Sequence, residues 1–234
     1  MTGRTRAAWL LGTGCILLAG ALFNPRAAAE VQGPKVEGVC TQPLVQVKAT
    51  NLEDVQDICR GVQDATSFLA GHGFLFDQPL VIEVADKLPE DAGPFALGCF
   101  FTHQSRIVVL SYAAFKEIRN WLNVPVSREL YRSLAAHETA HAWAESNISG
   151  PNQNLVAQEY IAYVVMFVTM NPDLRTSVLH AVPGFGFDDE LQINAMVYML
   201  DPVVFAVESY RHYLKPGNGP AFLQKVLTGK ALAE

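Results

Sequence analysis

The sequence predicts an α+β protein in which a small sheet with one helix is followed by a mostly helical C-terminal lobe. Short segments that alternate like strands, or are apolar throughout, occur in the part before about residue 126. Longer segments with apolar residues at helical spacing fill about 127–234. Half of the 234 residues are hydrophobic and 17% are charged, a composition typical of a globular domain with a sizeable core.

The first 29 residues have the pattern of a secretory signal peptide. Two arginines stand within the first six residues, residues 7–23 form a 17-residue run without a charge, and Ala27–Ala29 supplies small residues before a cut at Glu30. An uncleaved anchor is the alternative, although the run is at the lower limit for a bilayer span. We therefore expect a bacterial exported protein, periplasmic or secreted. Its mature chain, 30–234, should form one domain without a stable membrane span.

The charge of the mature chain excludes one class of partner. Without the leader the chain keeps 14 Lys+Arg against 23 Asp+Glu, a net charge of −9. An acidic protein without a basic stripe repels phosphate backbones and anionic membrane surfaces. We expect no nucleic-acid partner.

Three cysteines remain in the mature chain: Cys40, Cys59 and Cys99. In an oxidising compartment two of them can pair and leave one free, and all three pairings are open. Three buried thiols are the alternative. The odd count argues against a cysteine-based zinc site, which normally uses paired ligands.

The first half of the mature chain should form strands around one helix. Residues 30–43 are expected to be irregular. Asn51 should cap a helix that ends near Gly71, because apolar residues recur every three or four positions between them. The expected strands are Leu44–Ala49, Leu80–Ala85 and a hairpin of Phe95–Thr102 with Ser105–Ser111.

The second half should be helical. Pro125 and Ser127 precede the first expected helix, and Asn171-Pro172 ends the second. A Gly-rich loop then leads into three more. The expected helices are Arg128–Ser146, Leu155–Met170, Asp189–Leu200, Pro202–Leu214 and Ala221–Ala233.

Residues 137–141 read His-Glu-Thr-Ala-His, an H-E-x-x-H motif inside the first of these helices. Residues four apart share a helix face, so His137 and His141 can bind one metal ion. Glu138 lies about 100° round the helix from His137, within reach of a water on that ion. Chance produces the motif in roughly 1% of such chains. The alternative, a solvated polar face, is disfavoured because the helix is strongly apolar and buried imidazoles need partners.

The expected third ligand is Glu159, which follows His141 by 18 residues and stands in the next helix. The turn at 147–151 lets that helix fold back along the first. Two imidazoles and a carboxylate, with one position left open, suit a catalytic Zn²⁺. Glu145 shares the face of the histidines, but three ligands from one helix cannot easily complete a tetrahedron. Other possible ligands lie further along the chain: His180, Asp188 and Asp189.

An H-E-x-x-H motif with a Glu on the following helix resembles the gluzincin metallopeptidases. The resemblance implies a zincin-like fold, a Zn²⁺ held by His137, His141 and Glu159, and a peptide or protein substrate. It also implies that Glu138 is the general base of peptide-bond hydrolysis. In such a fold the edge strand of the sheet lines the cleft, and an extended peptide could add to it.

The sequence departs from the gluzincin pattern at Tyr163. Many gluzincins have an Asp there, one turn after the ligand Glu, and it orients a zinc-bound histidine. The departure favours an alternative function, a non-catalytic exported binding protein that keeps a zincin fold and a metal site. Retention of Glu138, which is not a ligand, favours the enzyme. Three residues near the end of a late helix are candidate oxyanion donors, with an aromatic core as the alternative: Tyr210, His212 and Tyr213.

Overall fold

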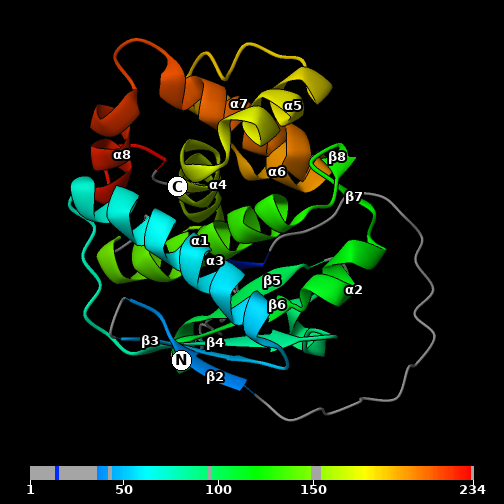
Figure 1. The fold of residues 1–234 in the computed structure, drawn as a ribbon. Helices are drawn as coiled ribbons and strands as arrows, with labels where there is room; N and C mark the ends of the chain where they lie inside the picture. The colour runs from blue at the N-terminus through cyan, green and yellow to red at the C-terminus, as the bar shows by residue number, and fades with distance from the viewer. Residues whose placement is uncertain (1–13, 16–35, 42–43, 94–95, 149–153, 233–234) are drawn as a thin grey trace, which may run out of the picture.

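The protein is an α+β structure in which a mixed sheet is covered on one face by helices, and a helical lobe packs on those helices (Figure 1). The computed structural model describes residues 14–15, 36–41, 44–93, 96–148 and 154–232. The predicted fold class, a small sheet followed by a mostly helical part, is confirmed. The predicted leader, 1–29, lies outside the described residues except for Gly14–Cys15.

The main sheet has six strands in the order β1-β5-β6-β4-β3-β2. Strands β3, β4 and β6 are parallel, and the predicted hairpin of β5 and β6 is antiparallel. The two edges are β2, which replaces part of the expected irregular stretch, and β1. The strand bounds are β1 Gly14–Cys15, β2 Val36–Val39, β3 Val45–Ala49, β4 Leu80–Ala85, β5 Gly98–Phe101 and β6 Arg106–Leu110.

Two 20-residue helices form the layer above the sheet: α1 (Leu52–Gly71) and α3 (Arg128–Asn147). Each begins at a side-chain cap. The Asn51 side chain accepts the N–H of Asp54 at 2.8 Å, and Ser127 does the same for Leu130 at 3.2 Å. These caps satisfy N–H groups that the first helical turn leaves without partners. Both helices were predicted within one residue of these ends.

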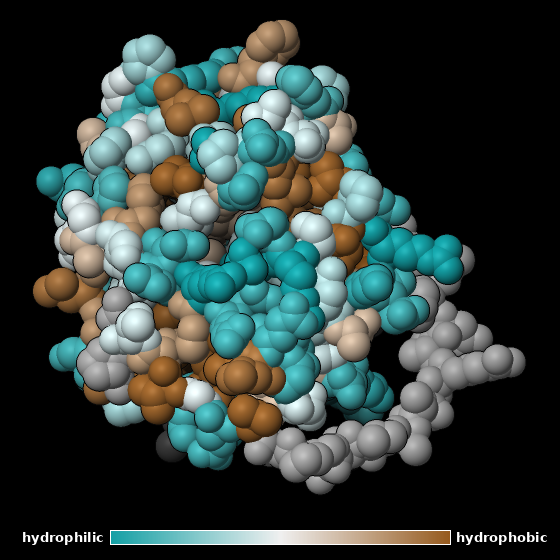
Figure 2. Space-filling model, in the orientation of Figure 1, coloured by the Kyte–Doolittle hydropathy of each residue, from teal (hydrophilic) through white to brown (hydrophobic). Residues whose placement is uncertain are grey.

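A buried ion-pair cluster holds α1 against α3. Nη1 of Arg128 lies 2.7 Å from Asp54 Oδ1 and 2.9 Å from Asp57 Oδ2, and Nε of Arg132 lies 2.7 Å from Asp57 Oδ1. Both aspartates are buried. The guanidinium of Arg128 also lies over the ring of Tyr112 at 3.9 Å. Because the two aspartates are removed from water and need these cations as partners, their pairing fixes how α3 lies on α1. Figure 2 shows hydrophilic side chains gathered near the centre of the view, where Figure 1 draws α1 and α3.

A disulfide joins Cys40, just after β2, to Cys59 in α1. It ties the edge of the sheet to the helix layer. The prediction that a third cysteine stays free is wrong, because Cys99 is not a free thiol either. In the β1–β5 register, Cys99 stands opposite Cys15, a residue that the sequence analysis had assigned to the removed leader.

The helical lobe begins with α4 (Leu155–Thr169), which is buried along almost its whole length between α3 and α7. Asn171 does not only end this helix, as expected, but also caps a new one, because its side chain accepts the N–H groups of Asp173 and Leu174. The expected helix 189–200 is a short 3-10 turn followed by α6. The remaining helices are α5 Pro172–Ala181, α6 Ala195–Leu200, α7 Pro202–Leu214 and α8 Gly219–Leu227.

Smaller elements link these parts. A helix and a two-stranded sheet connect β6 to α3: α2 Tyr112–Glu117, β7 Asn120–Trp121 and β8 Val124–Pro125. Single 3-10 turns occur at Glu90–Ala92, Thr102–Gln104 and Glu190–Gln192. One large apolar core runs from the sheet through α3 and α4 into α7. No helix of the described ranges is both long enough and apolar enough to cross a bilayer.

Candidate metal centre

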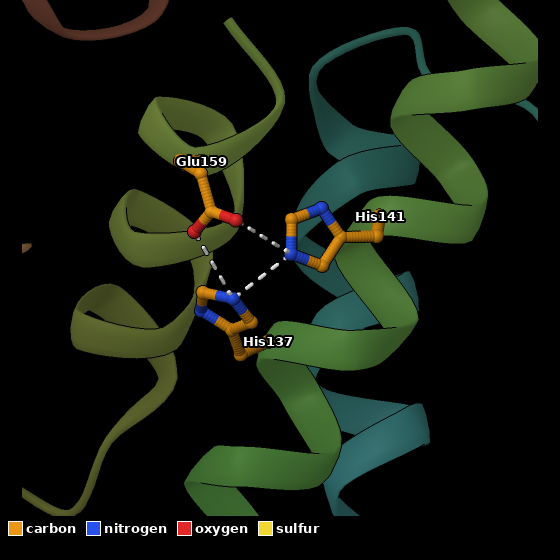
Figure 3. A group of neighbouring side chains, drawn as sticks. All are labelled: His137, His141 and Glu159. Carbon is orange, nitrogen blue, oxygen red and sulfur yellow. Dashed lines mark hydrogen bonds and ion pairs between the residues drawn. The ribbon is translucent and has the colours of Figure 1, made fainter. Parts of the chain in front are cut away.

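Two adjacent helices bring His137, His141 and Glu159 to one point. Nε2 of His137 lies 2.9 Å from Nε2 of His141 and 3.6 Å from Oε2 of Glu159. Nε2 of His141 lies 3.7 Å from Oε1 of Glu159. Figure 3 shows the carboxylate from α4 facing the two imidazoles from α3. One ligand atom from each residue lies within 4.8 Å of the others, a spacing that a single metal ion could bridge.

Local sequence explains why these three side chains meet. The histidines stand four apart in α3 and therefore share one face. The side chain of Asn154 accepts the N–H of Ala157 at 2.9 Å and starts α4, so Glu159 falls in the second turn. Part of the expected turn at 147–151 lies outside the described residues. Because α4 packs along α3, its second turn comes level with the motif.

The site is electrostatically unusual because it is closed from solvent. His137, His141 and Glu159 are at most 1% exposed. Burial lowers the pKa of His141 to about 4 and raises that of Glu159 to about 8. Burial, with a smaller effect of His141, holds the pKa of His137 well below its ordinary value. By itself the chain therefore favours neutral imidazoles and a protonated carboxyl group.

The donor set fits a divalent cation. Both carboxylate oxygens of Glu159 are buried, and apart from Tyr198, which is described below, no well-formed hydrogen bond reaches them from the described residues. Buried carboxylate oxygens with so few donors are rare and costly, and a cation would satisfy them. Zn²⁺ commonly binds neutral imidazole nitrogens together with carboxylate oxygens. The residues present thus fit a divalent metal ion, and the expected Zn²⁺ is among the ions that this donor set suits.

Glu138 lies beside this group without belonging to it. It is fully buried, and neither of its oxygens has a hydrogen-bond partner in the described part of the chain. Burial, and then the charge of Glu159, raise the pKa of Glu138 well above its ordinary value. On its other side Glu138 meets β5, where Gly98 leaves just enough room for the carboxylate.

Tyr163 takes the place of the Asp expected from the gluzincin pattern. It is 1% exposed, and its ring meets the His137 ring edge to face, with centroids 4.5 Å apart. The aromatic ring limits how the His137 imidazole can rotate. Burial raises the pKa of Tyr163 far above its ordinary value, and the nearby Glu159 and Glu138 add to this shift.

Two residues near the site were missed by sequence analysis. Tyr198, buried in α6, hydrogen-bonds toward Glu159 and partly offsets the effect of burial on its pKa. Gln158 precedes Glu159 in α4, and its amide hydrogen-bonds Glu145 at 3.0 Å. Tyr198 has no fixed spacing to the motif and could not be found from sequence. Gln158 could have been noticed as a polar neighbour in an apolar helix.

The three candidate oxyanion donors have other partners. Nδ1 of His212 lies 2.8 Å from the Tyr160 hydroxyl. Tyr210 stacks on Phe167 with ring centroids 5.1 Å apart. None of the described contacts of Tyr210, His212 or Tyr213 reaches the His-His-Glu group, and Tyr213 packs edge-on against Phe68.

The other possible ligands also lie elsewhere. Asp188 pairs with Lys215 at 2.7 Å, Asp189 caps the 3-10 turn that follows it, and His180 is exposed on α5. Glu145 faces Gln158. In the described residues, the one group of three or more ligating side chains close enough to share an ion is His137, His141 and Glu159.

Fold and site define an α+β protein with a buried candidate metal centre of two histidines and a glutamate between adjacent helices. Residues 45–234 match the model of a family of unknown function (DUF6639), and the chain therefore belongs to that family. No curated protein and no solved structure matches the chain.

Proposed function

We propose that the protein is an exported zinc metallopeptidase of zincin-like fold, with His137, His141 and Glu159 as the metal ligands and Glu138 as the general base. The observation that carries the proposal is the position of Glu138. A fully buried carboxylate that is not needed to complete the ligand group lies next to it. A structural metal site would have no use for this second acid.

The metal ion and the side chains of the protein would supply different parts of the hydrolysis reaction. Bound Zn²⁺ supplies a Lewis acid that polarises a peptide carbonyl and lowers the pKa of a water molecule. Glu138 accepts the proton of the attacking water and delivers it to the departing amine. Glu138 suits this task by its position, because its carboxylate is fully buried beside the ligands and has no hydrogen-bond partner in the described residues. The apolar surroundings keep other water away from the reacting groups.

The outer edge of β5 supports a peptide as the substrate. This edge pairs antiparallel with Gly14–Cys15, opposite Cys99 and Phe100. It therefore accepts an added strand one residue from Gly98, which contacts Glu138. A substrate chain placed there would run past the proposed base. For the edge to be open to a substrate, Gly14–Cys15 must leave it, and Cys99 must lose the disulfide bonding that it has in this structure.

The disulfide between Cys40 and Cys59 supports export, because such bonds persist mainly in oxidising compartments. Cleavage after the leader predicts a mature chain that starts near Glu30. N-terminal sequencing of the exported protein tests this part of the proposal. A mature chain that retains residues 1–29 would contradict it.

A non-catalytic exported binding protein is the second candidate. It is favoured by Tyr163 in place of an orienting Asp, and by the closure of the site, whose ligands are at most 1% exposed. Metal analysis combined with digestion of a broad peptide library separates the two functions. Zinc bound without any hydrolysis would support the binding protein.

The variant Glu138→Gln tests the catalytic role directly. The amide keeps the size of the side chain but cannot accept the proton. We expect zinc content and melting temperature to stay close to those of the wild type, while hydrolysis falls by several orders of magnitude. The matched control Glu117→Gln changes an exposed glutamate of α2 and should keep the hydrolysis of the wild type. Loss of zinc from Glu138→Gln would instead make Glu138 a ligand and refute the mechanism.

A further inference from the structure

His141 has one ring nitrogen that the metal site does not use. If Nε2 binds the metal, Nδ1 carries a proton and needs an acceptor, which sets the tautomer and the ring orientation. Nδ1 of His141 is buried, and no well-formed hydrogen bond reaches it from the described residues. In Figure 3 this nitrogen points away from Glu159 and His137. The position where a gluzincin would supply an Asp holds Tyr163, which packs on His137 instead.

The side chain of Gln158 reaches the turn of α3 that carries His141 and interacts with the imidazole. Its Nε2 donates to Oε2 of Glu145 at 3.0 Å. Glu145 stands one helical turn after His141 on the same face of α3, so the Gln158 amide crosses α3 in the turn that carries His141. Gln158 is only 8% exposed, and its Oε1 is buried without a partner in the described residues. A donor without an acceptor and an acceptor without a donor thus lie side by side.

Donor and acceptor chemistry allows one orientation of the amide. With Nε2 on the carboxylate of Glu145, Oε1 is left to accept the N–H of His141. The flipped amide would set Oε1 against a carboxylate and Nε2 against an N–H, so both contacts would be repulsive. The Gln158 side chain also raises the pKa of His141 against the larger lowering effect of burial, as an acceptor for its N–H should.

We propose that Gln158 and Glu145 form a relay that positions His141, in which Nδ1–H of His141 donates to Oε1 of Gln158 and Nε2 of Gln158 donates to Glu145. This inference rests on the metal site proposed above. The relay takes over the task of the orienting Asp, but through a neutral amide and from the helix that also supplies Glu159. In the gluzincin pattern the carboxylate of the Asp contacts the histidine directly. Here the carboxylate lies one residue further from the histidine, on the half-buried Glu145.

The first test is the zinc affinity of the full chain, measured by competition with a chromophoric chelator. Gln158→Leu keeps the bulk of the side chain but removes the acceptor, and should weaken zinc binding about 10- to 100-fold. Glu145→Gln keeps a hydrogen-bonding partner without the charge and should weaken it only a few-fold, on the order of 3-fold. The control Gln56→Leu changes an exposed glutamine of α1 and should leave the affinity unchanged.

The second test separates positioning from general structural support. Gln158→Glu alone sets two carboxylates against each other. The double variant Gln158→Glu/Glu145→Gln restores the polarity of the relay, because the new carboxylate can accept from both His141 and the new amide. We expect its zinc affinity to return to within about 3-fold of the wild type. If it stays as weak as Gln158→Leu, the relay is wrong.

The third readout is spectroscopic. In the ¹⁵N-histidine spectrum of the zinc-loaded protein, the Nδ1 proton of His141 should exchange slowly with water in the wild type and quickly, or not be seen, in Gln158→Leu. Unchanged proton exchange together with unchanged zinc affinity in Gln158→Leu would overturn the relay and leave the metal site intact. A wild type that binds no zinc would overturn the metal site, and the relay with it.

Discussion

The carboxylate of Glu138 and the backbone of Gly98 are in direct contact. A Cβ placed on Gly98 would lie 2.6 Å from both Cδ and Oε1 of Glu138, closer than such atoms approach in proteins. Strand β5 and helix α3 therefore meet at the proposed base without room for a side chain. Glycine is needed here because a side chain has no space, and not because of the backbone conformation, since the φ of Gly98 is not positive.

Gly98→Ala should displace the Glu138 carboxylate and leave the ligands in place. We expect zinc content to be retained and the hydrolysis rate to fall about 100-fold, the cost of a catalytic group moved by roughly 1 Å. The variant tests the position of the base without altering its chemistry. The control is Gly71→Ala, whose added methyl would meet nothing within 4 Å. Full activity of Gly98→Ala would mean that Glu138 tolerates displacement and is not a positioned base.

The double variant His137→Ala/His141→Ala should bind no zinc, because one carboxylate cannot hold the ion. Elemental analysis of the purified wild type should give about one Zn²⁺ per chain, the number that one three-ligand site can hold. His180→Ala is the matched control, since His180 is exposed on α5 away from the site. Stoichiometric zinc in the double variant would refute the site assignment.

Glu159→Gln should weaken zinc binding far more than Glu145→Gln. A neutral amide is a poorer zinc ligand than a carboxylate, and the carboxylate of Glu159 lies 3.6 and 3.7 Å from the two histidine nitrogens. Glu145 instead contacts Gln158. Chelator competition on both variants measures the difference. Equal losses, or a loss only in Glu145→Gln, would contradict Glu159 as the third ligand.

Asp57→Ala should lower stability without removing the metal. Asp57 is 2% exposed and pairs with Arg128 and Arg132, so its loss removes one carboxylate partner from each of two partly buried cations. We expect the free energy of unfolding to fall by about 2 to 3 kcal/mol, below the full cost of a buried pair because both arginines reach solvent. Urea denaturation measures this, with the exposed Asp77→Ala as control. A change below about 0.5 kcal/mol, the usual range for exposed sites, would show that the cluster does not hold the two helices.

Much of the local structure followed from sequence because it depends on near neighbours. Asn51 and Ser127 are caps by residue type and position, and the structure confirms both. The two histidines share a helix face because they stand four apart. Errors occurred where a residue has two local roles. Asn171-Pro172 ends α4 as expected, but the same pair also starts α5.

The sequence alone determined the α+β class, the motif helix and, through the length of the turn and the next helix, Glu159 as the partner of the histidines. Only the tertiary structure decided what surrounds them. It placed Tyr163 on His137, Gln158 beside His141 and Gly98 against Glu138. The physical reason is that spacing along the chain reports which residues share a face of one element. Contacts across elements depend on how helices and strands pack, and that packing minimises the free energy of the whole core rather than of any single segment.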